Sequence, residues 1–486
     1  MLSATKEDFM KRSALGPSAL VVALLVSAPW AIGAVAHPPR ALVGGTLVDG
    51  TGATPVKDAV VVIRDGRIVC AGARAACPIP PGVEVMDVSG MWVTPGLVDA
   101  HVHFAQTGWA DGRPDALDVR DRYPYEQVQA SLRAHPERFF RSYLCSGVTA
   151  VFDVGGYPWT WDLRARAAND PAAPHVAASG PLLSTYDFWL NVPGERQFIY
   201  LADEKAAREG VRYLAANGAD AVKVWYIPVK TRSAEEMAAV VMAAGDEARK
   251  VGLPLIVHAT ALHEAKVALK AGARLLVHSV EDQPVDDEFI AMARANGTIY
   301  CPTLTVGAGY LTMYEAFLAR KVPVVDDPNG CVDAVTLAHV AETASLSSDP
   351  APVQQRIEAR RARVAAGRTV MADNLKRVRD AGIPIAMGTD AGNPFTLAGP
   401  SVYAEMEAMQ AAGMTPMEVL VASTRTGALT LGSPGKDLGT VEAGKVADLV
   451  IVAADPTADV AGFRKLRYVV RGGVLHPVGE LVIRGR

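Results

Sequence analysis

"GADAVKVWYI", residues 218–227, places one lysine, Lys223, inside an otherwise apolar run. A short apolar run bounded by glycine and by Pro228 is typical of a buried strand in a parallel sheet. A lysine ammonium loses its hydration in such a strand and needs a compensating partner. No acidic residue follows nearby on this stretch. The partner of Lys223 must therefore come from elsewhere in the chain.

Seven further strand-like stretches surround this one and alternate with helical segments rich in alanine, glutamate and arginine. They are GLVDAHVHF (96–104), VTAVFDV (148–154), HVAASGP (175–181), LPLIVHA (253–259), RLLVHSV (274–280), TIYCPTL (298–304) and IPIAMGTD (383–390). Eight βα units that close on themselves form a (β/α)8 TIM barrel, an α/β fold that we expect over residues 94–432. A doubly wound open sheet is the alternative, but a glycine-rich dinucleotide turn is missing after the first strand.

The two chain ends have a different sequence pattern, in which short apolar runs are broken by turns. Residues 37–93 contain Asp65-Gly66 between two such runs, which is a strong hairpin signal. The same pattern returns over residues 433–486, so we expect both ends to form one small β-sandwich. Residues 306–381, between the seventh and eighth strands, are too long for an ordinary connection and are helical in their second half. We interpret this insertion as lid-like.

Residues 1–36 combine a basic patch, an apolar segment and the small-residue pattern Ala34-Val35-Ala36. This pattern predicts a secretory signal peptide that is removed after Ala36. An uncleaved membrane anchor over residues 14–36 is the alternative, since that segment is long enough to span a bilayer. We expect an exported protein, periplasmic or secreted, with no stable membrane insertion after cleavage.

The composition limits the partners of the chain. Half of its 486 residues are hydrophobic and its net charge is −4, so nothing suggests binding to nucleic acid. We expect a small-molecule substrate and a homo-oligomer. Export would permit disulfides among the five cysteines, and Cys70 and Cys77, which flank a short turn, are the first candidates. Sequence alone does not establish the bond, because it depends on Cβ geometry.

Polar residues gather near the predicted C-terminal ends of the strands, where barrel enzymes place their active sites. His101 and His103 are two apart on one strand and therefore point to the same side. Any single histidine is more often a hydrogen-bonded core residue than a metal ligand. The residues at these strand ends nevertheless match, as a set, the ligands that zinc and similar ions prefer. They are His101, His103, His258, His278 and Asp390. The remaining histidines are assigned structural roles: His135, His175, His263, His339 and His476.

A metal site would explain Lys223. Carbon dioxide can convert a neutral lysine amine into an anionic carbamate with two oxygens, and such a group can bridge two cations. Burial favours this reaction because it lowers the pKa of the amine. The alternative is a lysine that extends its ammonium to solvent at the strand end.

These stretches resemble the successive motifs of the metal-dependent amidohydrolase superfamily. The resemblance is carried by VTPGLVDAHVHF (93–104), GADAVKVW (218–225), LIVHA (255–259), LLVHS (275–279), MGTDAG (387–392) and VEAGKVADLVIV (441–452). Within the superfamily the chain is most similar to the imidazolonepropionase-related and Xaa-Pro dipeptidase-like branch.

The resemblance implies two divalent metal ions, zinc by preference. It implies that His101, His103 and Asp390 bind the more buried ion, that His258 and His278 bind the second, and that carboxylated Lys223 bridges them with a water or hydroxide. Asp390 would transfer the proton from this water to the leaving amine. Tyr226 is a candidate to bind the substrate carbonyl. The expected function is hydrolysis of an amide bond in a dipeptide or N-acyl amino acid, and the alternatives are a cyclic amide, lactone or other ester, or a non-catalytic binding protein.

Overall fold

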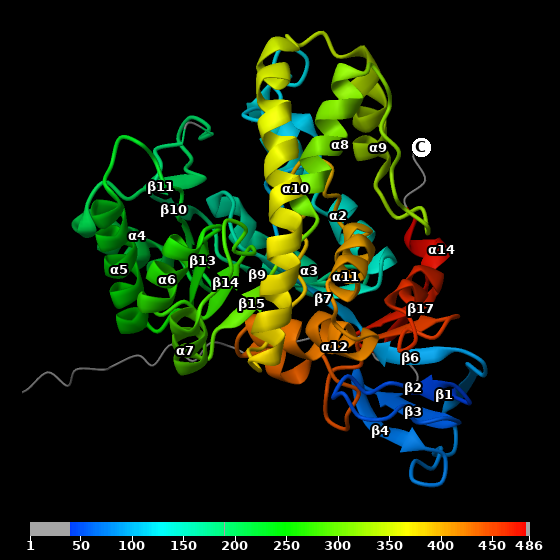
Figure 1. The fold of residues 1–486 in the computed structure, drawn as a ribbon. Helices are drawn as coiled ribbons and strands as arrows, with labels where there is room; N and C mark the ends of the chain where they lie inside the picture. The colour runs from blue at the N-terminus through cyan, green and yellow to red at the C-terminus, as the bar shows by residue number, and fades with distance from the viewer. Residues whose placement is uncertain (1–38, 189, 483–486) are drawn as a thin grey trace, which may run out of the picture. The chain divides into compact units, whose positions relative to one another are not determined.

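Parallel strands form the centre of the molecule (Figure 1). The computed structural model describes residues 39–188 and 190–482, so the predicted leader at 1–36 lies outside the described residues. The central strands are β7 (Leu97–Val102), β8 (Val148–Asp153), β9 (His175–Ala178), β10 (Leu182–Ser184), β12 (Val222–Trp225), β13 (Leu255–His258), β14 (Leu275–Val277) and β15 (Ile299–Cys301). Their residues are almost all buried, as expected for strands covered on both faces.

These strands pair in sequence order within two separate sheets, β7–β8–β9 and β10–β12–β13–β14–β15. β8 lies between β7 and β9, and β10, which follows β9 after a short break, pairs in parallel with β12. From β12 the order continues through β13 and β14 to β15. The stretch 383–391 then joins β15 to β7 through parallel bridges at Tyr300–Ile385 and Val102–Ala391. A (β/α)8 barrel requires this succession of neighbours.

The eighth stretch differs from its prediction as a regular strand, because it pairs only through isolated bridges. The nitrogen of Tyr300 donates to the Pro384 carbonyl (2.9 Å) and the nitrogen of Asp390 donates to the His101 carbonyl (2.8 Å). Pro384 has no N–H to donate, and Asp390 has a left-handed φ of 62°. Both features interrupt a regular ladder.

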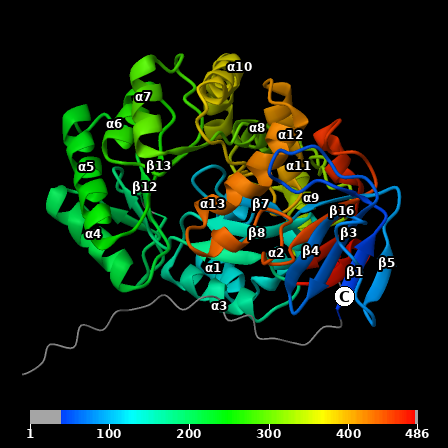
Figure 2. The ribbon, with the colours of Figure 1, turned by 90° about the horizontal axis from the view of Figure 1, so that it is seen from below.

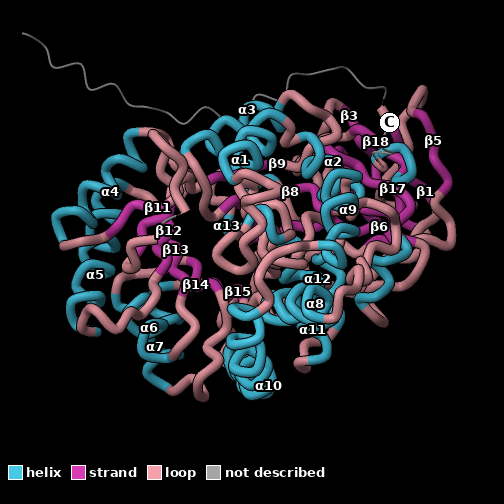
Figure 3. Tube along the Cα trace, turned by 90° about the horizontal axis from the view of Figure 1, so that it is seen from above, coloured by secondary structure: helices cyan, strands magenta, loops and turns pink. Residues whose placement is uncertain are grey.

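Helices cover the outside of these strands (Figures 1 and 3). They include α1 (Tyr125–Ala134), α2 (Glu137–Cys145), α3 (Leu163–Ala168), α4 (Glu204–Ala216), α5 (Ala234–Val251), α6 (Leu262–Lys270), α7 (Asp287–Asn296), α11 (Ser401–Ala411), α12 (Pro416–Val421) and α13 (Gly427–Thr430). In α5 a capping box between Ser233 and Glu236 begins the helix, and Gly252 ends it at φ 75°.

Strands from both chain ends form two further sheets that lie side by side (Figure 2). One sheet contains β4 (Arg67–Ala73), β3 (Ala59–Arg64), β1 (Arg40–Val43) and β5 (Glu84–Asp87), and the other β18 (Val474–Pro477), β17 (Leu466–Arg471), β16 (Leu449–Val452), β6 (Trp92–Pro95) and β2 (Thr46–Leu47). Val61 and Ile451 belong to one apolar core that both sheets share. Asp65 and Gly66, both with positive φ, form the turn of the β3–β4 hairpin.

The insertion at 306–381 contains α8 (Val306–Leu318), α9 (Ala334–Ala341) and α10 (Ala351–Asp380). The first half of α10 packs on α8 around Ile357, whereas Leu375 and Val378 of its second half belong to the central core. Asn374 in this half accepts a hydrogen bond from the nitrogen of Val285 (2.8 Å). The second half of α10 is therefore part of the wall around the strands. Over the described ranges, no helix combines the length and apolar character needed to cross a membrane.

Among the described residues the structure contains two disulfides, one between cysteines that are close in sequence and one between cysteines that are distant in sequence. Cys70 and Cys77 are bonded, with Cα atoms 5.7 Å apart, as the sequence suggested. Cys145 at the end of α2 is bonded to Cys331, which precedes α9, and this pair was not foreseen because 186 positions separate the two residues. Cys301 is free and buried.

Candidate metal centre

All six predicted metal ligands line one cavity of about 490 Å³. They lie on or directly after four strands (β7, β12, β13 and β14) and in the stretch that joins β15 to β7: His101, His103, Lys223, His258, His278 and Asp390. The structure thus brings together side chains that the sequence separates by nearly 300 positions. Tertiary folding builds one site from the ends of these segments, as in other barrel enzymes.

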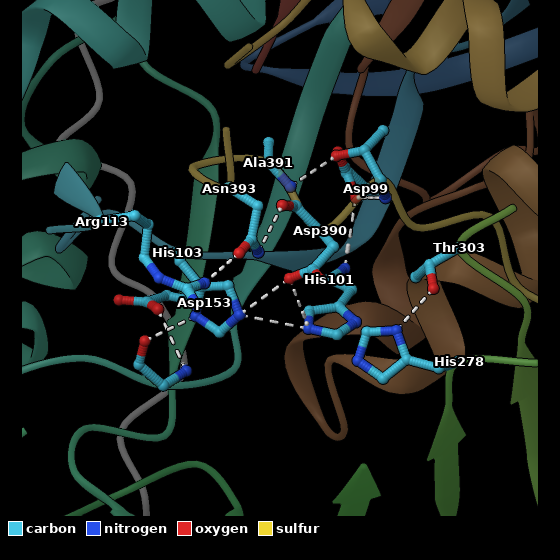
Figure 4. Close-up of polar contacts among 12 residues, drawn as sticks. Asp99, His101, His103, Arg113, Asp153, His278, Thr303, Asp390, Ala391 and Asn393 are labelled. Atoms are coloured by element: carbon cyan, nitrogen blue, oxygen red, sulfur yellow. Dashed lines mark hydrogen bonds and ion pairs between the residues drawn. The ribbon is translucent and has the colours of Figure 1, made fainter. Parts of the chain in front are cut away.

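His101, His103 and Asp390 form the tightest part of the site (Figure 4). Asp390 Oδ1 lies 3.2 Å from His101 Nε2 and 3.0 Å from His103 Nε2, and the two Nε2 atoms are 3.3 Å apart. All three side chains are buried. Asp390 Oδ1 has no hydrogen-bond partner among the described residues. Three buried ligand atoms that converge on one point, with Asp390 Oδ1 lacking a hydrogen bond among the described residues, fit a divalent cation held between them.

The orientation of His103 supports this assignment. Its Nδ1 donates to the carbonyl of Gly155 at 2.7 Å. Because a carbonyl only accepts, the proton is on Nδ1 and the lone pair of Nε2 faces the site. Such a second hydrogen bond commonly orients a metal-binding imidazole.

His258 and His278 form a second group beside the first. Their ring centres are 4.3 Å apart, and the ring of His278 is 5.0 Å from that of His101. His278 Nδ1 lies 2.6 Å from Thr303 Oγ1, and both residues have positive φ. Burial, with the charge of Lys223 as the next cause, lowers the pKa of His258 and of His101 well below the usual range. These imidazoles are therefore neutral at pH 7 and can act as ligands.

Lys223 lies among these histidines and is 1% exposed. In the part of the chain that the structure describes, no carboxylate forms an ion pair with it. Burial lowers the pKa of Lys223 to about 8, so that a substantial fraction of the amine is neutral near physiological pH. The alternative of a lysine that reaches solvent does not agree with this burial.

Buried carboxylates that the sequence analysis did not single out support the site from behind. Asp99 accepts hydrogen bonds from the Thr389 hydroxyl (2.6 Å) and from the backbone nitrogen of His101 (3.2 Å). Asp153 accepts from the nitrogen of Gly155, the residue that orients His103. Burial raises the pKa of Asp99 to about 7 and that of Asp153 to about 6. The sequence signal that could have identified Asp99 and Asp153 is their position on β7 and β8, the strands beside the site.

Gly388 lets the Asp390 segment pass close to β7. A Cβ atom at this position would lie 2.6 Å from Cys301 Sγ and 2.9 Å from His101 Cβ. Such contacts would force the segment away from the strand. The glycine in MGTDAG therefore helps to bring Asp390 to the two histidines.

Tyr226 has a different position from the one expected of a substrate-binding residue. Its side chain is 1% exposed and is not part of the cavity wall, whereas its neighbour Trp225 lines the cavity. Successive side chains of an extended segment point to opposite sides. Because Lys223 and Trp225 face the cavity, Tyr226 faces away from it, and we no longer assign it to the substrate.

Residues 92–475 match the profile of the Amidohydrolase family. The chain belongs to the amidohydrolase family. Imidazolonepropionases of Caulobacter vibrioides and Rhizorhabdus wittichii are similar to it, at 26% identity over 454 residues and 28% over 458, each covering 86% of this chain and 94% of the relative. A Xaa-Pro dipeptidase structure covers 90% of this chain and all of its own, with a TM-score of 0.65 and 22% identity. A structure of A. niger ochratoxinase covers 90% of this chain and 96% of its own, with a TM-score of 0.64 and 22% identity.

Membership places this amidohydrolase among enzymes that hydrolyse carbon–nitrogen bonds and depend on metals. The family match and the structural neighbours imply a (β/α)8 barrel with an additional domain. The converging donor atoms of His101, His103 and Asp390 fit the metal dependence of the family.

Proposed function

We propose that this amidohydrolase is a binuclear metal-dependent hydrolase that cleaves an amide bond in a dipeptide or N-acyl amino acid. The observation that carries the proposal is the convergence of His101, His103 and Asp390 beside the buried Lys223. His101, His103 and Asp390 would hold one divalent ion, His258 and His278 a second, and carboxylated Lys223 would connect the two. Zinc suits this donor set.

Two such ions, when bound, supply an activated water at neutral pH and polarise the scissile carbonyl. The remaining work belongs to side chains of the chain itself. Asp390 Oδ1 lies at the centre of the site and is able to accept a proton from the attacking water and donate it to the departing amine. Asp99 and Gly155 hold His101 and His103 in place. The aromatic cavity wall at Trp225 excludes water from one side.

The proposal is tested with Asp390→Asn, because a ligand and a proton carrier behave differently. An amide expels an amine that must be protonated, whereas an aryl ester expels a group that need not be. We expect the variant, loaded with two equivalents of zinc, to lose about 10²- to 10⁴-fold in kcat on amides and much less on activated aryl esters.

The measurement is kcat on both substrates together with metal content in the same samples. The wild type is assayed on N-acyl amino acids, Xaa-Pro dipeptides, lactones and aryl esters, which separates amide cleavage from the ester and lactone alternatives. Equal losses on amides and esters, or full recovery with added metal, would remove Asp390 from proton transfer. A wild type that hydrolyses only lactones or esters would contradict the proposal.

A further inference from the structure

The wall of the active-site cavity contains both aromatic rings and arginines. Three aromatic rings, those of Phe188, Phe198 and Trp225, pack together with centres 5.0–5.2 Å apart. Trp225 is also 6.1 Å from the ring of His258. This part of the cavity wall is therefore apolar and adjoins the second histidine pair.

The cavity wall also contains three arginines, Arg113, Arg360 and Arg363. Two of them are neutralised within the protein. Arg113 binds Asp115 through two hydrogen bonds of 2.8 Å, and Arg363 binds Glu281 at 2.8 Å. These two ion pairs bring little net charge to a ligand.

Arg360 has a different environment. It projects from α10, is half-buried, and its guanidinium carbon lies 4.4 Å from the centre of the Tyr310 ring. Across residues 39–188 and 190–482, no carboxylate forms an ion pair or hydrogen bond with it. A half-buried guanidinium that is stacked but lacks an anion can still use its planar set of N–H donors to bind a carboxylate.

Arg360 is connected to the reacting end of the cavity through two residues. The hydroxyl of Tyr310 donates to Asn393 Oδ1 at 2.8 Å, and Asn393 Nδ2 donates to the carbonyl of Asp390 at 3.1 Å. Arg360 is therefore linked to the segment of Asp390, the residue proposed to protonate the leaving amine. The aromatic cluster lies beside His258 through Trp225.

We propose that Arg360 binds a free carboxylate on the amine half of the substrate, while the acyl half lies against Phe188, Phe198 and Trp225. This inference rests on the proposed amide hydrolysis, because Asp390 defines the side on which the amine departs. The substrate class is thus an amide of an apolar acyl group with an amino acid whose carboxylate is free. Arg360 sets specificity and takes no part in bond cleavage.

The test compares N-benzoyl-L-leucine with N-benzoyl-L-leucinamide, which differ chiefly in the charge at the carboxyl end. Benzoate release is measured with the zinc-loaded wild type, Arg360→Gln and Arg368→Gln. Arg368 is exposed on the same helix and does not line the cavity, so it is the matched control. We expect the wild type to prefer the acid, and Arg360→Gln to lose about 10- to 100-fold in kcat/KM on the acid and far less on the carboxamide.

A wild type that cleaves both compounds equally, or an Arg360→Gln variant that loses the same factor on both, would overturn the inference. A binding experiment separates this inference from the proposed function. Calorimetry measures the binding of N-benzoyl-L-leucine to zinc-loaded Asp390→Asn, with and without Arg360→Gln. Binding that depends on Arg360 without any amide turnover by the wild type supports the carboxylate site and contradicts amide hydrolysis. Amide turnover that does not depend on Arg360 supports amide hydrolysis and contradicts the carboxylate site.

Discussion

At the scale of single residues, Lys223 is the residue whose chemistry depends most on its surroundings. Its burial on β12 removes the hydration of an ammonium, and the histidines around it offer no negative charge. A protonated Lys223 would repel the cation that we propose for His101, His103 and Asp390. The carbamate proposed for Lys223 would have the opposite charge and would attract that cation.

Replacing Lys223 with alanine is expected to lower the metal content below two equivalents and to reduce kcat by more than about 100-fold, since it removes a ligand rather than a residue behind one. Metal analysis and amide assays on the same samples measure both effects. Short carboxylates such as propionate should restore part of the activity by occupying the vacated space. Lys266→Ala is the control, because Lys266 binds Asp286 and Glu288 and does not line the cavity. Full metal content and activity in Lys223→Ala would exclude a bridging role.

At the scale of secondary-structure elements, the insertion at residues 306–381 is held to the rest of the protein by hydrogen bonds at the start of α8. α8 begins just after Leu304 and Thr305, whose nitrogens donate to the buried carboxylate of Glu405 at 2.7 and 3.0 Å. The Thr305 hydroxyl also donates to it at 2.8 Å. Glu405 on α11 thus satisfies donors at the start of α8. Because Tyr310 on this helix faces the cavity, the anchor also positions the cavity wall.

Glu405→Ala is expected to destabilise the protein by about 3 kcal/mol, because it leaves three part-buried donors without their acceptor. Glu407→Ala on the same helix is the comparison. Glu407 binds Arg464 at a partly exposed site, so its loss should cost about 0.5–1 kcal/mol. Chemical denaturation with matched slopes measures both free energies of unfolding. Equal losses for the two variants would mean that Glu405 does not anchor α8.

At the scale of the whole molecule, the Cys145–Cys331 disulfide ties the insertion to α2. Its ends are 186 positions apart, and closing so long a loop stabilises a folded chain by about 5 kcal/mol in the chain-entropy account. The bond also agrees with the export that we propose from residues 1–36, because disulfides persist in oxidising compartments. The homo-oligomer stays a prediction.

Protein isolated from an exporting host without reductant is expected to contain one titratable thiol per chain in denaturant, that of Cys301, and five after reduction. Reduction should also lower the thermal midpoint. Thiol titration and a thermal scan provide the two measurements, and Cys301→Ser, with no thiol before reduction, is the control. Five thiols in unreduced protein would show that the chain matures in a reducing environment.

The sequence by itself determined which segments become strands and which polar residues stand near their ends. Apolar runs are local patterns, and a histidine pair at positions i and i+2 must face one side of its strand, so His101 and His103 could be assigned without coordinates. Only the tertiary structure decided what these residues meet. The contact of Asp390 with the two histidines and the bond from Cys145 to Cys331 join segments distant in the chain. The lack of an ion pair to Arg360 among the described residues and the position of Tyr226 outside the cavity wall likewise depend on packing between distant segments. The physical reason is that local sequence controls backbone preference and side-chain alternation, whereas packing between distant segments determines which charges are compensated and which face the substrate.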